Sequence, residues 1–507
     1  QPGAAALPNA PATAQNAAAV PGATAAPAFQ AQRITVTTDV VKATINTQGG
    51  VIERLELLKY RDKIDQAKNQ VLFDNVAKHI YLGQTGLVGN DPMGTMPNHT
   101  TGFTVRPGTG APDANGNTTL VLDAESGGVR LTKTYVFKKG DYTIDLRHDV
   151  ANTGTAPVQP ALYLQITHDG NKPEGDSYFN STYTGPTLYT SQEHYQKLTF
   201  DELAKGKAEY AKKATDGWIA MSQHFFVSAF VPPQKAAREN YAEPVPGETN
   251  LYRIGTRIPL GTVQPGTAVS NVAKLYSGPQ DEKHLETIAP GLELVKDYGK
   301  FAVLSKPIFW VIDQMHRVIG NWGWTIVAFT VLLKLLFFPL SAAGFRSMAR
   351  VKLVTPKLQA IRERYKDDPA KMNQATMELY KSEKINPLGG CLPLLVQMPV
   401  FIALYYVLQA SVEMRGASWG WIPDLTISDP YFILPVLYII SMFVSTRLNP
   451  QPADPVQAKM MMAMPIIFGF MFFFFPAGLV LYWVVNNLLS IAQQWVITKK
   501  FDTGAAK

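Results

Sequence analysis

Lys334 stands out chemically because it is a cation inside an apolar segment. It lies near the middle of residues 325–340, which read TIVAFTVLLKLLFFPL and are apolar enough to lie in a membrane. A charge at the centre of a bilayer costs roughly 3 kcal/mol or more, so such residues usually face a hydrated or protein-lined cavity. The sequence therefore predicts a polar pocket within the membrane around Lys334.

The alternative for Lys334 is a side chain that extends to the lipid headgroups. The next basic residue, Arg346, follows 12 positions later, which corresponds to about 18 Å along a helix. A lysine side chain reaches only about a third of that distance. The spacing thus favours the pocket over this alternative.

Polar side chains recur at helical spacing in the apolar segments of the same region. Thr330 lies one turn before Lys334, on the same face of the predicted helix. The other polar positions are Gln397; Tyr438, Ser441 and Ser445; and Tyr482, Asn486, Ser490 and Gln493, beside Trp483, Asn487 and Gln494. Such groups either hydrogen-bond one helix to another or line a hydrated interior. Each of these sets of residues forms a polar stripe along its predicted helix. Both readings stay open for each stripe alone, and a lysine among them favours the hydrated interior.

Methionines gather in one apolar segment. It carries Met460, Met461, Met462, Met464 and Met471, followed by four phenylalanines. Methionine surfaces adapt to partners of varied shape. The segment is therefore predicted either to contact an apolar partner or to face lipid.

The composition argues against several other kinds of chemistry. The single cysteine, Cys391, excludes an internal disulfide and a cysteine zinc cluster. No phosphate-binding loop of the type GxxxxGK[ST] is present, and we expect no cofactor. No Asp or Glu lies within the apolar segments, which argues against a proton-driven pump.

The first half of the chain has the pattern of an exported all-β domain. Residues 1–32 are rich in Ala and Pro, lack charge and predict a disordered tether. Short alternating runs separated by glycine turns then predict a large β-sandwich over 33–290, interrupted by one helix at about 200–213. We interpret this domain as a scaffold, with a sugar-binding cleft as the alternative.

Residues 291–320 are predicted to form an amphipathic helical region at the membrane surface. Phe309, Trp310 and Ile312 lie among Asp313, His316 and Arg317 there, and Pro307 is expected at the start of the helix. The alternative is a short helix packed on the β-domain.

The remaining chain, 321–500, predicts a helical membrane domain with a short tail at 501–507. We expect five spans, at about 322–343, 390–411, 431–447, 459–475 and 478–498. The connection 344–386 carries ten Lys or Arg and five Asp or Glu, so the positive-inside rule places it in the cytoplasm. The β-domain is then outside and the C-terminus inside. An exported domain ahead of the first span also predicts an N-terminal membrane anchor upstream of this sequence.

The connection 344–386 has a helical pattern of its own. Apolar residues recur at steps of three and four from Val351 to Tyr365, and Asp368 with Pro369 can start a second helix. An antiparallel helical hairpin is expected, whose basic residues include Arg350, Lys352, Lys357, Arg362 and Arg364. This basic face could meet a ribosome, RNA or anionic lipid, or could simply be solvated.

Several motifs resemble the YidC family of membrane-protein insertases, in its Gram-negative form with a large periplasmic domain. They lie at residues 386–406 (NPLGGCLPLLVQMPVFIALYY), 338–340 (FPL), 347–350 (SMAR), 356–357 (PK) and 475–482 (FPAGLVLY). The resemblance covers nearly the whole chain. It implies an α-helical five-span insertase core, an exported β-supersandwich and a cytoplasmic helical hairpin.

The resemblance also implies a function without covalent chemistry or nucleotide hydrolysis. Family members insert and help to fold nascent inner-membrane proteins through a hydrophilic groove, alone or with the Sec translocon. A positive residue in the groove receives the polar part of the client. Lys334 matches that position, where the family usually has arginine, so the charge is kept and the guanidinium fork is lost.

The predicted site follows from the stripes and the resemblance together. The groove residues are Lys334, Thr330, Gln397, Tyr482, Trp483, Asn486 and Ser490, and an apolar client segment is expected to slide along Met398, Met464 and Met471. The expected partners are nascent membrane proteins, the Sec translocon, the ribosome and lipids, with no specific nucleic acid. An anion or small-solute transporter and a non-inserting assembly platform are the alternatives.

Overall fold

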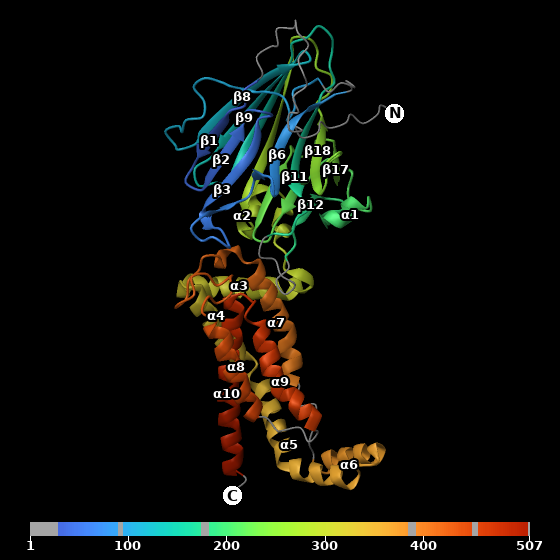
Figure 1. Ribbon diagram of the computed structural model, residues 1–507, viewed down its shortest axis with the longest axis vertical. Helices are drawn as coiled ribbons and strands as arrows, with labels where there is room; N and C mark the ends of the chain where they lie inside the picture. The colour runs from blue at the N-terminus through green and yellow to red at the C-terminus, as the bar shows by residue number, and fades with distance from the viewer. Residues whose placement is uncertain (1–28, 90–94, 174–181, 384–391, 449–454, 505–507) are drawn as a thin grey trace. The chain divides into compact units, whose positions relative to one another are not determined.

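The computed structural model describes residues 29–89, 95–173, 182–383, 392–448 and 455–504. Within these ranges the chain forms two compact units, the first ending at Lys296 and the second beginning at Asp297. The first unit is built mainly from strands and the second from helices (Figure 1). Each unit is described on its own.

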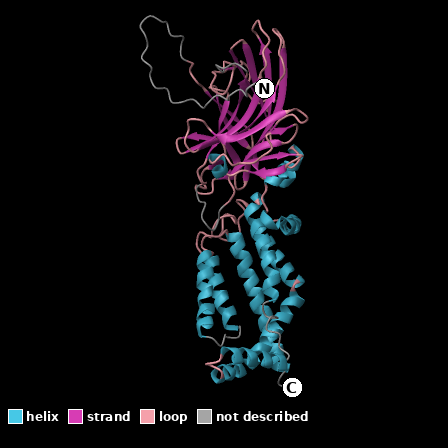
Figure 2. Cartoon of the chain, turned by 90° about the vertical axis from the view of Figure 1, so that its right-hand side faces the viewer, coloured by secondary structure: helices cyan, strands magenta, loops and turns pink. Residues whose placement is uncertain are grey.

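The first unit is a sandwich of two antiparallel sheets (Figure 2). One sheet has the order β1-β2-β3-β6-β11-β18-β17-β14, with β4 on β3 and β5 on β6. Its strands are β1 (Arg33–Thr37), β2 (Val41–Asn46), β3 (Val51–Arg61), β4 (Asn69–Val71), β5 (Asp74–Val76), β6 (His79–Val88), β11 (Ala161–Asp169), β14 (Lys213–Ala214), β17 (Arg238–Pro244) and β18 (Leu251–Pro259).

The other sheet has the order β13-β12-β15-β16-β19-β10-β9-β8-β7. Its strands are β7 (Thr104–Val105), β8 (Thr118–Ser126), β9 (Val129–Phe137), β10 (Thr143–Asn152), β12 (Gly185–Thr190), β13 (His194–Lys197), β15 (Trp218–Ser222), β16 (Phe226–Val231) and β19 (Ala268–Pro279). The β-sandwich predicted from the alternating runs is confirmed.

The turn glycines show why the strands pair as they do. Gly49 and Gly50, between β2 and β3, have φ of +80° and +57°, and Gly127 and Gly128, between β8 and β9, have φ of +60° and +70°. Residues with a Cβ rarely adopt this left-handed backbone, so glycine pairs fix where each hairpin reverses.

One cation lies between the two sheets. On β9, Val129, Leu131, Lys133, Tyr135 and Phe137 all point to the same face and are at most 2% exposed. Lys133 Nζ donates to the carbonyl oxygens of Gly49 and Thr85, both at 2.7 Å. The lysine thus joins β9 to the opposite sheet, and burial lowers its pKa to about 7.

The helix predicted at about 200–213 is much shorter in the structure. Helix α1 (Phe200–Ala204) begins with a capping box between Thr199 and Glu202. It ends before Gly206, whose φ is +64°. The left-handed glycine stops the helix, and the prediction of its length was wrong.

Two short helical elements close the first unit. They are α2 (Glu282–Ile288) and η1 (Leu292–Val295), whose apolar side chains pack on the sheet that contains β15 and β16. Trp218 of β15 donates its indole N–H to the carbonyl of Pro290 at 3.1 Å.

The second unit is a helical bundle. Its elements are η2 (Gly299–Phe301), α3 (Ala302–Ile319), α4 (Trp322–Leu336), α5 (Phe338–Arg364), α6 (Pro369–Ser382), α7 (Leu392–Ala410), η4 (Val412–Met414), α8 (Ile433–Leu448), α9 (Pro455–Met471) and α10 (Ala477–Gly504). Helix α10 packs against α4, α5 and α8, while α9 packs against α8. The predicted helical C-terminal part is confirmed.

Among the described residues, no single helix has both the length and the apolar character needed to cross a bilayer. The consecutive helices Trp322–Leu336 and Phe338–Val351 meet these criteria only as a pair, with a bend of 67° between them.

Helix α3 is amphipathic and packs on α4 and α7. Ile308, Phe309 and Ile312 are buried in the core of the second unit, whereas Trp310 is 63% exposed. The helix begins at Ala302, so Pro307 lies inside it and not at its start as predicted. The carbonyl that Pro307 leaves without an N–H belongs to Val303, whose residue is 92% exposed, so solvent can satisfy it.

Candidate functional site

Lys334 lies in the last turn of α4 and not in the middle of a continuous helix. Helix α4 stops at Leu336, and α5 starts again at Phe338, bent by 67°. Pro339 explains the break, because it has no N–H to donate to the carbonyl of Leu335. Lys334 therefore belongs to the last turn of a helix, where the partly negative carboxyl end favours a positive charge.

The side chain of Lys334 reaches α10. Its Nζ donates to Ser490 Oγ at 2.7 Å, and the Ser490 hydroxyl donates to the backbone carbonyl of Asn486 at 2.8 Å. One turn earlier on α10, Asn486 Oδ1 accepts from Gln397 Nε2 of α7 at 2.7 Å. The structure thus brings together Lys334, Gln397, Asn486 and Ser490, which the sequence places on three separate segments.

A cavity adjoins these residues. It is partly open, and its lining comes from α4, α5, α7, α10 and the residue between α4 and α5. The lining residues are Leu333, Lys334, Phe337, Leu340, Ser341, Gln397, Val400, Tyr482 and Asn486. A cation, a hydroxyl, two amides and a phenol therefore meet at one apolar-walled hollow.

Sequence reasoning did not single out Ser341 or the apolar lining residues. Ser341 follows Lys334 by seven positions, which is two helical turns, and this spacing was the available signal. The bend at Phe337 is what places the first turn of α5 beside the cavity.

Three of the predicted groove residues do not line the cavity: Ser490, which contacts Lys334 as described above, Thr330 and Trp483. Thr330 is fully buried, and its hydroxyl donates to the carbonyl of Ile326 on its own helix at 2.7 Å. Trp483 packs among aromatic rings, with ring centroids 4.7 Å from Phe401 and 6.0 Å from Phe472. Its indole N–H has no hydrogen-bond partner among the described residues.

The stripe on α8 joins helices. Tyr438 and Ser441 are buried, and Asn487 Nδ2 of α10 donates to Ser441 Oγ at 3.4 Å. This geometry matches the reading in which polar side chains hydrogen-bond one helix to another.

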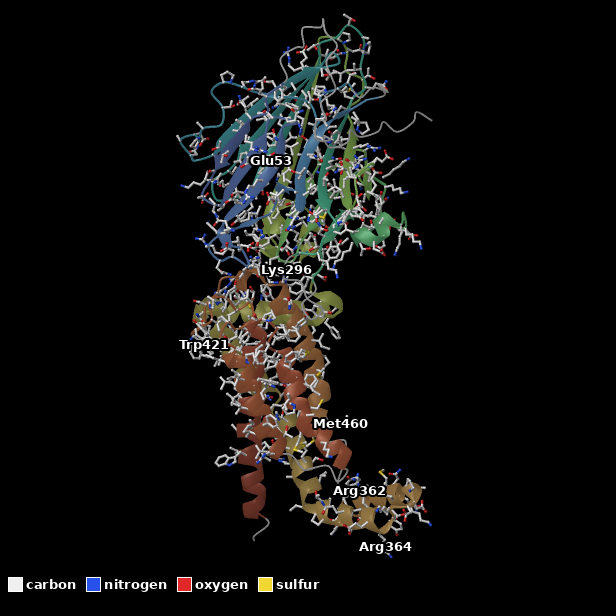
Figure 3. All side chains as sticks on the ribbon, in the orientation of Figure 1. Glu53, Lys296, Arg362, Arg364, Trp421 and Met460 are labelled. Carbon is white, nitrogen blue, oxygen red and sulfur yellow. The ribbon has the colours of Figure 1, made fainter. Side chains whose placement is uncertain are left out.

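The methionines proposed as a sliding surface differ in exposure. Met398 of α7 is 40% exposed and Met464 of α9 is 41% exposed, while Met471 packs against the core of the bundle. Met460, labelled on α9 in Figure 3, is 64% exposed. Most of α9 thus presents an apolar surface outward.

The basic residues of α5 lie largely on its outside. Arg350 and Arg364 are exposed, Arg362 is partly exposed, and Figure 3 shows Arg362 and Arg364 toward the end of α5. Lys357 pairs with Glu383 at 2.5 Å, which ties the end of α6 back to α5. The side chain of Lys352 lies outside the described residues.

Helix α6 starts as its sequence predicts. Asp368 Oδ1 accepts from the backbone N–H of Lys371 at 3.1 Å, and Pro369 occupies the first helical position. This hydrogen bond and a second one from the side chain of Lys371 lower the pKa of the Asp368 carboxyl.

Acidic residues also hold the loop that precedes α8. Asp429 is 2% exposed and accepts from the indole N–H of Trp421 at 3.1 Å and the backbone N–H of Leu434 at 2.8 Å. The loop is also hydrogen-bonded to the start of α10, because the backbone N–H groups of Ala477 and Gly478 donate to the carbonyls of Ile427 and Leu425. This end of the bundle is therefore closed by ordered backbone and aromatic rings.

The parts of the chain that the structure describes contain no cluster of metal-binding side chains. No group of three or more His, Cys, Asp or Glu side chains is placed there to hold an ion.

Comparison with known proteins gives two family matches. Residues 33–311 match the family described as the YidC periplasmic domain, and residues 314–504 match the family described as 60Kd inner membrane protein. Together the two matches span both structural units.

Individual relatives extend over nearly the whole chain. The membrane protein insertase YidC of Janthinobacterium sp. (strain Marseille) is 55% identical, with 97% of this chain and 88% of the relative covered. That of Herminiimonas arsenicoxydans is also 55% identical, with 95% and 86% covered. A solved structure, described as an active YidC insertase with its first transmembrane domain resolved, is 18% identical, with a TM-score of 0.41 and 91% of each chain covered.

Proposed function

Because the chain belongs to the YidC family of membrane protein insertases, we propose that Lys334 and the cavity around it receive the polar part of a client protein. The chain is an inner-membrane insertase with a periplasmic β-sandwich, and its clients are nascent membrane proteins. What remains to be assigned is which residues act on the client, and how.

The observation that carries the proposal is the unneutralised charge beside the cavity. Within the described part of the chain, Lys334 has no carboxylate within ion-pair distance, and its hydrogen-bond partner is the neutral hydroxyl of Ser490. A carboxylate would add the attraction of a full negative charge to the hydrogen bond, which a neutral hydroxyl cannot supply. An acidic residue of a client would therefore be a better partner for this ammonium than Ser490.

The physical problem for an insertase is desolvation. Moving an isolated polar group from water into hydrocarbon costs roughly 2–7 kcal/mol, and a charge costs more. A polar cavity that extends partway into the bilayer shortens the apolar path that the client tail must cross. Lys334, Gln397, Tyr482 and Asn486 provide one cation and three hydrogen-bonding groups along that path.

Release of the client needs no nucleotide under this proposal. Burying one large apolar side chain gains about 1.5–3 kcal/mol, so the client's apolar segment draws the chain into lipid. The exposed side chains of Met398 and Met464 offer an adaptable surface for that segment. We accordingly assign the activity to binding and guidance, without covalent chemistry.

Topology and partners complete the proposal. We propose that the five predicted spans place the hairpin of α5 and α6 and the C-terminus in the cytoplasm, supported by the basic excess of 344–386. The basic face of α5 would then be available to the ribosome, and the family context suggests the Sec translocon as a second partner. The domain limits at 33–290, 291–320 and 321–500 are part of the same proposal.

The test compares Lys334→Ala, Lys334→Arg and the unchanged protein in reconstituted vesicles. The clients are a short membrane protein with an aspartate in its translocated tail and a twin with asparagine at that position. Lys334→Ala is expected to lower the ratio of aspartate-client to asparagine-client insertion by about tenfold, the scale of a lost charge-assisted hydrogen bond. Lys334→Arg keeps the charge and should keep the ratio.

Lys459→Ala is the matched control. Lys459 precedes the methionines of α9, is exposed and does not line the cavity, so its removal changes net charge equally. If Lys334→Ala and Lys459→Ala give the same ratio as the unchanged protein, the charge at position 334 has no role in receiving clients.

A further inference from the structure

We infer that Ser490 is a positioning residue, which holds the Lys334 ammonium against α10 until a client carboxylate replaces it. The inference rests on the proposed function and assigns a role to a residue that does not itself line the cavity. Its basis is the pair of hydrogen bonds that the Ser490 hydroxyl makes on α10.

The direction of those bonds gives Ser490 a defined task. A serine hydroxyl has one proton to donate and two lone pairs to accept with. The proton is directed to the carbonyl of Asn486 at 2.8 Å, so only acceptor capacity remains toward Lys334 Nζ at 2.7 Å. The backbone of α10 thereby orients the hydroxyl, and the hydroxyl orients the ammonium.

A lysine needs such a guide because its side chain is flexible. Four rotatable carbons separate the ammonium from the backbone, and fixing a lysine side chain costs up to about 2 kcal/mol of rotamer entropy. Other acceptors lie around the same cavity, including Ser341, Gln397 and Tyr482. Without Ser490 the ammonium would distribute itself among these groups and water, and fewer molecules would present it to a client.

The chemistry also explains why the guide is a neutral group. A carboxylate at position 490 would neutralise Lys334 and compete strongly with an acidic client. A hydroxyl holds the ammonium in place, yet it is the weaker partner when a carboxylate arrives. The client's charge would then be bound at the boundary between α4 and α10.

The experiment uses two variants of nearly equal shape. Ser490→Thr keeps the hydroxyl, whereas Ser490→Val replaces it by a methyl group with the same branching. Each full-length variant is reconstituted in vesicles and tested with the aspartate client and its asparagine twin. Ser490→Val is expected to lower the aspartate-to-asparagine insertion ratio by about fivefold. Ser490→Thr is expected to keep the ratio of the unchanged protein.

A double substitution separates positioning from a packing effect. If Ser490 acts through Lys334, adding Ser490→Val to Lys334→Ala should lower the ratio no further. If Ser490→Val and Ser490→Thr give equal ratios, or if the effects of the two sites multiply, the inference is overturned.

The outcomes also distinguish this inference from the proposed function. A lowered ratio in Lys334→Ala with an unchanged ratio in Ser490→Val leaves the role of the charge and removes that of the serine. An unchanged ratio in Lys334→Ala removes the role of the charge itself.

Discussion

At the scale of single residues, Lys133 and Lys334 are withdrawn from water in different ways. Lys133 is fully buried and donates to two backbone carbonyls of the opposite sheet and its turn. Lys334 is partly buried beside a cavity and donates to one hydroxyl. The first arrangement uses the amine to join two sheets, and the second leaves the ammonium available to a further partner.

The buried position of Lys133 predicts a specific pH dependence of stability. Burial lowers its pKa from 10.5 to about 7, so between these values the unfolded chain binds a proton that the folded chain does not. The free energy of unfolding should therefore rise between pH 7 and pH 10, by roughly 1 kcal/mol per pH unit. Denaturant unfolding followed by the β-sheet circular dichroism signal measures this slope.

Lys133→Met is the control for that slope. It removes the titrating amine, and it is also expected to destabilise the domain because two buried carbonyls lose their donor. The free energy of unfolding will differ between the two proteins at every pH, so only its slope against pH is compared. Parallel curves for the two proteins between pH 7 and pH 10 would contradict the assignment of the effect to Lys133.

At the scale of elements, the joint between α4 and α5 sets the geometry of the cavity. The bend of 67° places Lys334 at a helix end and brings Phe337, Leu340 and Ser341 to the lining. A straight helix would carry Ser341 farther along the axis of α4. The joint is therefore as much a part of the site as the polar side chains.

Replacing Pro339 by alanine should straighten this joint. The new N–H can bond to the carbonyl of Leu335, and alanine favours a helix interior over proline by about 3 kcal/mol. Spin labels at Trp324 and Leu353, which are 57% and 69% exposed, report the change. Their separation is expected to increase by about 7 Å, from the rise of a helix and the angle of the bend.

Pro356→Ala provides the comparison for Pro339→Ala. Pro356 also lies in α5, but away from the joint. It should leave the bend of 67° at Phe337 unchanged. Equal label separations in Pro339→Ala and in the unchanged chain would show that proline is not the cause of the bend.

The sequence was most informative where a local rule decides the structure. Alternation and left-handed glycines located the β-hairpins, and Asp368 with Pro369 located the start of α6. The same rules, applied too loosely, extended α1 beyond Gly206, and they did not foresee the bend at Phe337 within the span predicted at 322–343. Gly206 ends α1 because glycine readily adopts the left-handed backbone, and Pro339 interrupts the helical hydrogen bonds because it has no N–H.

The sequence indicated which polar side chains share a helix face, but not which of them pair. The spacing of Tyr482, Asn486 and Ser490 correctly puts them on one face of α10. Which of them meets Lys334 and which meets Gln397 depends on how α4, α7 and α10 pack, and one sequence does not contain that information. Trp483 follows Tyr482 directly and so points about 100° away, into the aromatic cluster.

At the scale of the whole molecule, the two units differ in what stabilises them. The β-sandwich is held by paired strands and buried side chains, and the bundle exposes many large apolar residues on α8 and α9. Contiguous exposed apolar surface is typical of contact with membrane or with a protein partner. The family places this bundle in the inner membrane, where such a surface can lie against lipid.

The insertase should respond to the apolarity of its client and not to nucleotide. In vesicles that contain only this protein, each leucine-to-serine change in the client's apolar segment is expected to lower insertion by about tenfold, because the transfer to lipid drives the process. Leucine-to-isoleucine changes at the same positions are the control. A requirement for added ATP, measured by protease protection of the client tail, would contradict this energetics.

Helix α5 also has a mechanical property. It runs without a break for 27 residues from the joint at Phe337 to the loop before α6, a length of about 40 Å. A rotation of about 5° about the joint at Phe337 moves the far end of the helix by about 3.5 Å. Displacements at Arg362 and Arg364, near the far end of the helix, are therefore coupled to small rotations at the joint beside Lys334.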